Sequence, residues 1–421
     1  MRVQSGYVVS LISHGFALTM APALVSRGLA YRAAHARVGS PTGTSMTQAF
    51  RHLPLGYKIS HVSTVHPPFD VRIFHKECRS LAEAGFDVSF VVPHEHDERI
   101  DNISIVGLPK PRNRVIRMLV TSALAFVRAL ATRARIYHIH DPELVPVGLL
   151  LKIVGKKVIY DAHEDLPRQI MIKNWISPAL RPLVAHVAEK FEEFAVRCFD
   201  SVVAATPVIG ERFRKFNGST VVVNNYPLPR EFQKTVDWDN RERAVCYLGL
   251  ISRARGIEEI IRALDYADVT LHLAGSFSDE GLLQEMKRLP SWSRVRYYGF
   301  IDRQQVMSLM SQCKVGLVCL HPTPNYVDSQ PIKLYEYWGA ALPVVASNFP
   351  RWVELIEGNQ CGLCVDPKKP ELIARAISHL LAHDSEARRM GENGRRLVET
   401  AFNWKCEEEK LLRIYSQLVG K

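Results

Sequence analysis

The sequence lacks the cysteine pairs that build a disulfide framework or a zinc site. Its 421 residues contain eight cysteines, which are scattered from position 78 to position 406. Cys361 and Cys364 form the closest pair, and no second pair stands at a spacing typical of zinc ligands. We therefore predict that Cys361 and Cys364 belong to a strand. We also expect a reducing compartment such as the cytosol, where free thiols persist.

The sequence also lacks short-period repeats, low-complexity blocks and stretches in which basic and aromatic residues interleave. No nucleic-acid-binding module is recognisable, so we expect no nucleic-acid partner. Lysine and arginine number 54 against 43 acidic residues, a net charge of +11 with a pI near 9.2. This balance favours phosphates or an anionic membrane surface as partners.

Between Arg2 and Arg27 there is no lysine, arginine, aspartate or glutamate. An uncharged stretch of this length is compatible with a signal peptide or a weak membrane anchor. Its serines, glycines and proline make it a poor spanning helix, however. We predict a loosely ordered leader over residues 1–54, with Met46 as an alternative start.

Beyond residue 55, short apolar segments alternate with amphipathic ones, as in a parallel α/β fold. The first series of expected strands is 57–62, 86–92, 136–140, 157–160 and 201–205, with helices at 72–84, from 143 and at 178–199. The second series of expected strands is 244–248, 269–274, 295–298, 314–320 and 344–346, with a helix from 257. The pattern predicts two Rossmann-like domains, 55–230 and 231–400, that face each other across a cleft, and a final segment at 401–421.

The most informative segment runs from Asp328 to Glu336, just ahead of an apolar strand. Pro331 suits the first turn of a helix, because its missing N–H is not needed there. Asp328 then lies in the loop before the helix, and Glu336 lies in the second turn. Backbone N–H groups near Ser329 and Gln330 would face an incoming anion, assisted by the helix dipole.

Two side chains of the same segment add binding groups. Lys333 supplies a positive charge one turn into the helix, and the Glu336 carboxylate can accept two hydrogen bonds from a ribose diol. The segment can therefore hold a ribose and a diphosphate together. An ordinary helix with a solvated acid and base fits the same spacing, so the pattern alone leaves both interpretations open.

Two further loops of the second domain are expected to reach the cleft. In the first, Gly249 allows close backbone approach, and Arg253 and Arg255 can clamp a phosphate. A basic surface turn is the alternative for this loop. In the second, the backbone at Phe300 and Ile301 follows a strand and can contact a flat nucleotide base.

The first domain offers candidates on the other side of the cleft. His163 directly follows a strand, where it can hydrogen-bond a sugar hydroxyl, assist proton movement, or only cap the next helix. Asp70 and Arg72 flank an early loop, and they either contact an acceptor or form an internal ion pair. His138 and His140 resemble part of a metal site, but no further ligand set stands at convincing spacing, so we expect no metal.

One stretch of the first domain combines an apolar run, residues 118–127, with flanking arginines. These arginines are Arg112, Arg114, Arg117, Arg128, Arg133 and Arg135. The composition is typical of a basic amphipathic helix that lies on an anionic membrane surface. The alternative is a helix that covers a sheet and exposes its arginines to solvent.

Together these residues resemble the GT-B glycosyltransferases, in particular the large retaining family numbered 4, over about residues 57–415. That family carries an E-x7-E motif before a strand, and the stretch that ends at Ala346 matches its second half. Glu336 would be the second acid, which by resemblance holds the nucleotide ribose. Asp328 stands at the first acid, where the family usually has glutamate, so the implied contact with the transferred sugar is less secure.

The resemblance also implies a basic pair for the donor diphosphate. Arg255 matches the family's lysine before a glycine, whereas Leu250 replaces the expected arginine. Arg253 or Lys333 would then supply the missing charge. His163 stands where the family often has a histidine facing the sugar.

The implied reaction is a retaining transfer without a metal cofactor, with His163, Asp328 and Glu336 as catalytic residues. Cationic residues and a helix N-terminus would stabilise the departing diphosphate. By the same resemblance, the last helix, from about Glu407, crosses back onto the N-terminal domain.

We therefore predict a glycosyltransferase that moves a sugar from a nucleotide-diphosphate sugar to a lipid-linked or polysaccharide acceptor. We expect it at the inner face of the cell membrane, in the biosynthesis of surface polysaccharide. A sugar-nucleotide epimerase of the same fold is one alternative, and it would not depend on an acceptor. A catalytically inactive membrane scaffold is another, because the first acid is shortened and one arginine is missing.

Overall fold

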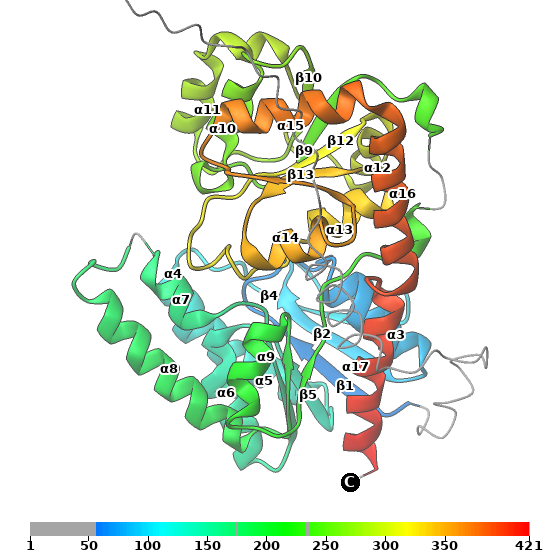
Figure 1. Cartoon of the computed structure of the whole chain (residues 1–421). Coiled ribbons are helices and arrows are strands. Elements are labelled where there is room, and N and C mark those ends of the chain that lie inside the picture. Colours follow the sequence, from blue (N-terminus) through cyan, green and yellow to red (C-terminus); the bar gives the residue numbers. More distant parts are fainter. Residues whose placement is uncertain (1–55, 174, 233–235, 421) are drawn as a thin grey trace, which may run out of the picture. The chain divides into compact units, whose positions relative to one another are not determined.

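The computed structural model describes residues 56–173, 175–232 and 236–420, which contain two α/β sheets with their covering helices (Figure 1). The leader predicted over residues 1–54 lies outside the described residues. Within the described part, every helix is too short or too polar to cross a membrane. The predicted fold class, two Rossmann-like domains, is confirmed.

The first sheet has eight strands in the order β3-β4-β2-β1-β5-β6-β7-β8, and among its pairs only β3 and β4 are antiparallel. The strands are β1 (Lys58–Val62), β2 (Asp87–Pro93), β3 (Glu98–Ile100), β4 (Ile103–Leu108), β5 (Ile136–Ile139), β6 (Lys157–Ala162), β7 (Ser201–Ala204) and β8 (Thr220–Val222). All five predicted strands are present. β3, β4 and β8 were not predicted; β3 and β8 have only three residues each, too few for a sequence period.

Helices cover both faces of this sheet, which explains why its central strands β1 and β5 are almost continuously buried. One face packs against α5 (Ser122–Ala131), α6 (Val145–Ile153), α8 (Arg181–Cys198) and α9 (Pro207–Arg214). The other face packs against η1 (Ile73–Cys78), α3 (Arg79–Glu83) and α17 (Trp404–Val419). Two short helices, α4 (Arg114–Ile116) and η2 (Arg117–Thr121), precede α5, and α7 (Leu166–Met171) follows β6.

The second sheet has six parallel strands in the order β11-β10-β9-β12-β13-β14. They are β9 (Ala244–Leu248), β10 (Thr270–Ala274), β11 (Val295–Tyr297), β12 (Val315–Val318), β13 (Val344–Ser347) and β14 (Gly362–Val365). Cys364 lies in β14, as predicted, whereas Cys361 directly precedes that strand. The five strands of the predicted series are all present, and β14 is the strand that was predicted at Cys361 and Cys364.

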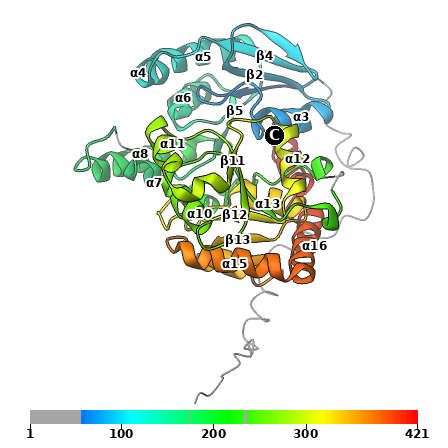
Figure 2. The same cartoon turned by 90° about the horizontal axis from the view of Figure 1, so that it is seen from above.

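Helices α10 (Ile257–Ala263), α11 (Glu280–Lys287) and α15 (Pro370–Ala382) share one apolar core with this second sheet (Figure 2). The remaining described helices of this half are η5 (Trp238–Asn240), η6 (Arg253–Arg255), η7 (Pro290–Arg294), α12 (Arg303–Gln312), α13 (Ile332–Gly339), α14 (Pro350–Ile356) and α16 (Asp384–Thr400). A Cβ added to Gly316 of β12 would lie only 2.4 Å from the Tyr337 ring of α13. A glycine in β12 therefore lets α13 lie close to the sheet.

Helix α17 returns from the end of the chain to the N-terminal sheet, as the resemblance implied (Figure 1). Trp404 Nε1 donates a hydrogen bond to Ser80 Oγ over 2.9 Å, and Glu407 accepts the Asn224 backbone N–H over 2.9 Å. The helix begins at Trp404, three residues before the predicted start, because the Asn403 side chain caps its first turn.

The strand order reverses between β1 and β5 in the first sheet and between β9 and β12 in the second. Loops that leave neighbouring strands at such a reversal diverge, which opens a crevice at the carboxyl ends of the strands. Ligand-binding residues are therefore expected on the loops after these four strands and their neighbours.

Candidate functional site

A cavity of about 300 Å³ is lined by residues of both domains. The N-terminal domain contributes Arg72, the loop after β6 with helix α7, and the start of α9. The C-terminal domain contributes Arg255, Leu320 and most of the segment from 324 to 333. Seven predicted site residues lie in this lining: Arg72, His163, Arg255, Asp328, Ser329, Gln330 and Lys333.

Arg255 is held at the cavity by a turn that only glycine can complete. Gly256, the next residue, has φ of +71°, and a Cβ there would lie 2.0 Å from the Cys319 carbonyl oxygen. The turn therefore packs directly on the end of the β12 region. Burial lowers the pKa of Arg255, but contacts with Tyr247 and Tyr326 outweigh it and raise that pKa above its usual value. Arg255 is thus a fixed positive charge at the cavity.

Lys333 is a second basic side chain at the same wall, and it is only 6% exposed. Its Nζ lies 3.6 Å from the centroid of the Tyr247 ring and has no hydrogen-bond partner among the described residues. Burial, together with the neighbouring charge of Arg255, lowers the pKa of Lys333 well below its usual value. A Cβ at Gly249 would lie 3.8 Å from this Nζ, so the glycine leaves the ammonium group open on that side. An anion in the cavity would supply the missing partner.

Asp328 forms ion pairs with one arginine from each domain. Its Oδ2 lies 3.1 Å from Arg168 Nη1 on α7, and its Oδ1 lies 3.6 Å from Arg351 Nε on α14. The sequence pattern gave no sign of Arg168, because α7 belongs to the other domain. The first acid of the motif is therefore neutralised at the edge of the cavity.

The prediction of a free backbone N–H group at Ser329 is wrong. The Ser329 backbone N–H donates to the Tyr326 carbonyl oxygen over 3.0 Å, because the chain forms turns before α13 instead of starting the helix there. Helix α13 begins at Ile332 with Pro331 as its N-cap residue. The side chain of Gln330 accepts a hydrogen bond from the Tyr226 hydroxyl over 3.4 Å.

Glu336, the predicted ribose acid, is buried and is not among the residues that line the cavity. Its Oε1 lies 2.6 Å from Arg303 Nη1 on α12, and Arg303 also pairs with Glu231 over 2.7 Å. The sequence pattern missed Arg303, which begins a different helix. Ribose binding by Glu336 stays a prediction, and it requires competition with this ion pair.

Four other predicted donor contacts are not among the residues that line the cavity: Gly249, Arg253, Phe300 and Ile301. Arg253 is 52% exposed and pairs with Glu258 over 3.0 Å and with Glu285. Phe300 is 84% exposed. Leu250 replaces the arginine that the family uses to bind the donor diphosphate. Of the two candidates to supply that positive charge instead, the geometry favours Lys333 over Arg253.

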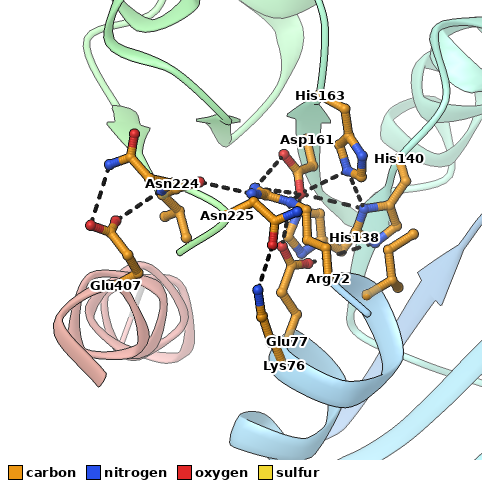
Figure 3. A network of polar contacts seen from close by, with 12 residues as sticks. Arg72, Lys76, Glu77, His138, His140, Asp161, His163, Asn224, Asn225 and Glu407 are labelled. Atoms are coloured by element: carbon orange, nitrogen blue, oxygen red, sulfur yellow. Dashed lines mark hydrogen bonds and ion pairs between the residues drawn. The ribbon is translucent and has the colours of Figure 1, made fainter. Parts of the chain in front are cut away.

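On the N-terminal side, His163 belongs to a buried polar network (Figure 3). Its Nε2 lies 3.1 Å from Asp161 Oδ2, and Arg72 Nη2 donates to both oxygens of Asp161 over 3.0 and 3.1 Å. Burial raises the pKa of Asp161, but Arg72 and His163 outweigh it and hold that pKa well below its usual value. Asp161 is thus a buried carboxylate that anchors both side chains.

Arg72 does form an internal ion pair, as one alternative required, but its partner is not Asp70. Arg72 pairs with Asp161 and, through Nε, with Glu77 Oε1 over 3.0 Å. Asp70 instead closes its own turn: its Oδ1 accepts the backbone N–H groups of Arg72 and Ile73 over 2.8 and 2.9 Å. Acceptor binding by Arg72 stays a prediction, and this residue does line the cavity.

Parallel strand pairing gathers further histidines behind His163. His61 of β1 stands opposite His138 of β5 in the strand register, and donor atoms of these two, His140 and Glu77 lie within 4.8 Å of one another. Such a set can in principle hold a metal. In this structure, however, His61 Nδ1 and His140 Nε2 share a hydrogen bond of 2.9 Å, while Glu77 pairs with an arginine. The absence of a catalytic metal stays a prediction.

Two family models match this chain. Residues 71–225 match the glycosyl transferase 4-like domain, and residues 230–397 match the glycosyl transferases group 1. The chain belongs to the group 1 glycosyltransferases.

Individual relatives agree with this assignment. An uncharacterized glycosyltransferase of Methanocaldococcus jannaschii is 23% identical over 388 residues, which covers 85% of this chain and 97% of that protein. The MMP alpha-(1->4)-mannosyltransferase of Mycolicibacterium hassiacum is 20% identical over 336 residues, 75% of this chain and 77% of that protein. These matches identify the protein as a transferase enzyme.

Solved structures share the fold. Sucrose-phosphate synthase of Thermosynechococcus elongatus aligns with a TM-score of 0.71 at 20% identity, over 86% of this chain and 99% of that one. The Anabaena HepE protein in complex with UDP-glucose aligns with a TM-score of 0.63 at 15% identity, over 86% of this chain and 99% of that one. The glycosyltransferase described here therefore has the GT-B arrangement of two Rossmann-like domains.

The predicted basic helix of this glycosyltransferase covers the sheet, as one of its two interpretations required, and its contact with a membrane stays a prediction. Ala125 and Ala129 of α5 are buried against the sheet, so the helix does cover it. On the segment just before α5, Met118, Leu119 and Val120 are exposed. The helical region thus packs small residues inward and presents an apolar surface outward.

Lys76 of η1 was not predicted to have a role, yet its charge interacts with Glu231 and Glu336 of the C-terminal domain. Its Nζ is buried and donates to Asn225 Oδ1 over 2.7 Å. Burial lowers the pKa of Lys76 to about 7, although Glu336 and Glu231 partly offset this. A charge next to Glu336 thus titrates near neutral pH.

Proposed function

We propose that this glycosyltransferase takes its sugar from a nucleotide-diphosphate sugar bound in the cavity between Arg255, Lys333 and His163. The sugar is passed to a lipid-linked or polysaccharide acceptor at an anionic membrane surface. The transfer retains the anomeric configuration and needs no metal. The observation that carries this proposal is the buried Lys333 ammonium, which has no hydrogen-bond partner among the described residues.

A buried ammonium group without a partner is costly, and a diphosphate would compensate it. Arg255 lines the same cavity and can add a bidentate contact to a phosphate. As the bond to the sugar breaks, negative charge develops on the leaving diphosphate, where two preplaced cations stabilise it. This is the chemistry that a metal ion performs in other transferases.

The sugar would lie between the diphosphate and the N-terminal wall. His163 and Asp328 line the cavity on either side of this space. In a retaining transfer on one face, the leaving phosphate oxygen takes the acceptor proton, so no strong protein base is required. Closure of the cavity around the donor would exclude water, which otherwise competes as acceptor.

An apolar surface supports the membrane part of the proposal. Many of the exposed large apolar side chains belong to α4, η2, the end of α7, α8 and the segment between α7 and α8: Val115, Met118, Leu119, Val120, Met171, Ile172, Trp175, Leu180, Leu183, Val184, Val187, Phe191 and Phe194. The Arg114 guanidinium lies 5.2 Å from the Trp175 ring centroid, so the two segments adjoin. Exposed arginines beside apolar side chains suit a bilayer with anionic headgroups.

A thermal-shift screen against nucleotide sugars tests the donor without knowledge of the acceptor. The cognate nucleotide sugar should raise the melting temperature of the wild type and have a far smaller effect on Lys333→Met. Transfer of radiolabelled sugar to a membrane extract then distinguishes a transferase from an epimerase, which needs no acceptor. A screen in which no nucleotide sugar stabilises the wild type would refute the proposed donor.

Sedimentation with vesicles tests the membrane surface. Vesicles that contain anionic lipid should carry down the wild type, whereas neutral vesicles should carry down much less. Replacing Arg112 and Arg114 with glutamine, or Leu119 and Val120 with aspartate, should weaken sedimentation. Arg388→Gln, on α16 in the other domain, is the matched control. Equal sedimentation of all variants would reject this surface.

A further inference from the structure

Asn225 lines the cavity near the point where the chain passes from the first domain to the second. On one side of it, Glu407 of α17 accepts the Asn224 backbone N–H over 2.9 Å and the Asn224 side-chain N–H over 3.2 Å. On the other side, the Tyr226 ring packs against the Tyr335 ring of α13, with the ring centroids 4.7 Å apart. The backbone at Asn225 is therefore held from both sides.

The side-chain oxygen of Asn225 is already engaged inside the protein. Lys76 Nζ donates a hydrogen bond to Asn225 Oδ1 over 2.7 Å, a contact that Figure 3 shows. Lys76 is buried, and Asn225 is its one hydrogen-bond acceptor among the described residues. A protonated lysine has three donors and no acceptor, so an amide turned the other way would bring two donors face to face. The ammonium group therefore fixes the amide with its oxygen toward Lys76.

The NH₂ group of the same amide is left for a ligand. Within the part of the chain that the structure describes, Asn225 Nδ2 makes no hydrogen bond. Asn225 is half-buried and lines the cavity, so a molecule bound there can reach its side chain. An NH₂ group binds an oxygen that accepts a hydrogen bond, and it does not bind a cation.

Arg72, the neighbouring basic residue of the cavity wall, cannot supply that oxygen. A guanidinium group carries donors only. Arg72 Nη1 donates to the Val223 carbonyl oxygen over 2.9 Å, and its Nη2 pairs with Asp161 over 3.0 Å. The acceptor for Asn225 must therefore come from the ligand. A sugar hydroxyl suits this position, because it can accept from the amide and donate elsewhere.

We infer that Asn225 is a specificity-determining residue, whose NH₂ group binds a hydroxyl oxygen of the transferred sugar or of the acceptor. Lys76 holds the amide in the orientation that this contact requires. The inference rests on the proposed function, because it takes the ligand of the cavity to be a nucleotide sugar together with its acceptor.

Two variants at the same position test the contact. Asn225→Asp and Asn225→Ala both remove the NH₂ donor, but only the aspartate adds a charge and only the alanine removes the acceptor of Lys76. Asn225→Asp should keep the wild-type melting temperature, because its carboxylate faces the Lys76 ammonium group. A loss of binding in this variant is then not a loss of fold.

Titration calorimetry measures the binding of the nucleotide sugar found by the screen above. Burial lowers the pKa of Lys76 to about 7, so the titrations are run at pH 6, where the ammonium form predominates. If the hydroxyl belongs to the transferred sugar, both variants should bind the nucleotide sugar about tenfold more weakly. Asn225→Ala should bind the matching nucleoside diphosphate, which lacks the sugar, within about twofold of wild type. A loss that Asn225→Asp shows for both ligands measures its added charge.

Transfer to a membrane extract tests the other source of the hydroxyl. If the hydroxyl belongs to the acceptor, Asn225→Ala should bind the nucleotide sugar like wild type. Its transfer rate should then fall about tenfold at limiting extract and recover at saturating extract. Lys76→Met keeps the NH₂ group and removes only the group that orients it, so its loss should be at most about threefold in the same assay.

Wild-type binding and wild-type transfer in both Asn225 variants would overturn the inference and leave the proposed donor in place. If Asn225→Ala fails to fold, Asn225→Asp, which keeps an acceptor for Lys76, still decides between these outcomes. A wild type that no nucleotide sugar stabilises would instead refute the proposed function. The two failures are thus distinguishable.

Discussion

The Arg168 guanidinium lies 3.1 Å from the Asp328 carboxylate, and this ion pair joins α7 of the N-terminal domain to the segment before α13. Both side chains are about one-third exposed. Such a pair contributes less than about 1 kcal/mol to the free energy of unfolding. Its importance lies instead in the compensation of the Asp328 negative charge by Arg168 at the cavity.

Arg168→Gln should leave the melting temperature within about 3 °C of wild type and weaken nucleotide-sugar binding about fivefold. The reason is that the Asp328 carboxylate would then face the donor diphosphate without its closest counter-charge. Arg351→Gln is the control, because Arg351 lies farther away, at 3.6 Å, and is more exposed. Isothermal titration with the donor measures both. Unchanged affinity in Arg168→Gln would contradict this electrostatic role.

Lys333→Met should raise or preserve the melting temperature, because it removes a buried cation that has no hydrogen-bond partner among the described residues. The same change should weaken binding of the nucleotide sugar by more than about tenfold. Arg253→Met is the matched control, since that arginine is exposed and paired on the surface. A similar loss of affinity in both variants would indicate that Arg253 also binds the donor.

Donor binding should take up protons at pH values between the lowered pKa of the free Lys333 and its higher pKa in the complex. Burial lowers the pKa of Lys333 well below its usual value, and a diphosphate would favour the charged form and raise that pKa again. Affinity should therefore fall as pH rises above the pKa of the free lysine. Titration calorimetry in buffers of different ionisation enthalpy measures the uptake. The uptake should vanish in Lys333→Met; equal uptake there would assign the proton to another group.

Lys76 should make stability depend on pH in a defined direction. Burial lowers its pKa to about 7 in the folded protein, whereas in the unfolded chain it is about 10.4. Between these values the unfolded chain binds more protons, so the free energy of unfolding rises with pH by at most about 1.4 kcal/mol per unit. Below pH 7 both states are protonated and the full cost of the buried charge is present.

Lys76→Met should therefore raise the melting temperature most at pH 6, and the difference from wild type should shrink toward pH 10. Lys152→Met is a suitable control, because Lys152 is a half-buried residue that pairs with Asp200 over 2.7 Å. Melting curves at pH 6, 8 and 10 measure the effect. A difference that does not change with pH would show that Lys76 is not the titrating group.

Much of the fold follows from local pattern. The strand β9 and the start of α10 coincide with their predicted residues, because an apolar run and a strand-to-helix glycine turn are both local signals. The three-residue strands β3 and β8 were missed, since their only support is pairing with a neighbour. Ser329 was misjudged for a related reason: its N–H bonds to a turn whose formation the spacing did not reveal.

The sequence by itself determined the two α/β domains, the glycosyltransferase resemblance, and Lys333 and Arg255 as cationic candidates. Periodicity and short motifs encode these features, because they depend on neighbouring residues. Only the tertiary structure decided which residues meet: Arg168 with Asp328, Arg303 with Glu336, and Tyr415 with the histidines of β1 and β5. Such partners lie on different elements, and side-chain distance across a fold has no counterpart in sequence spacing.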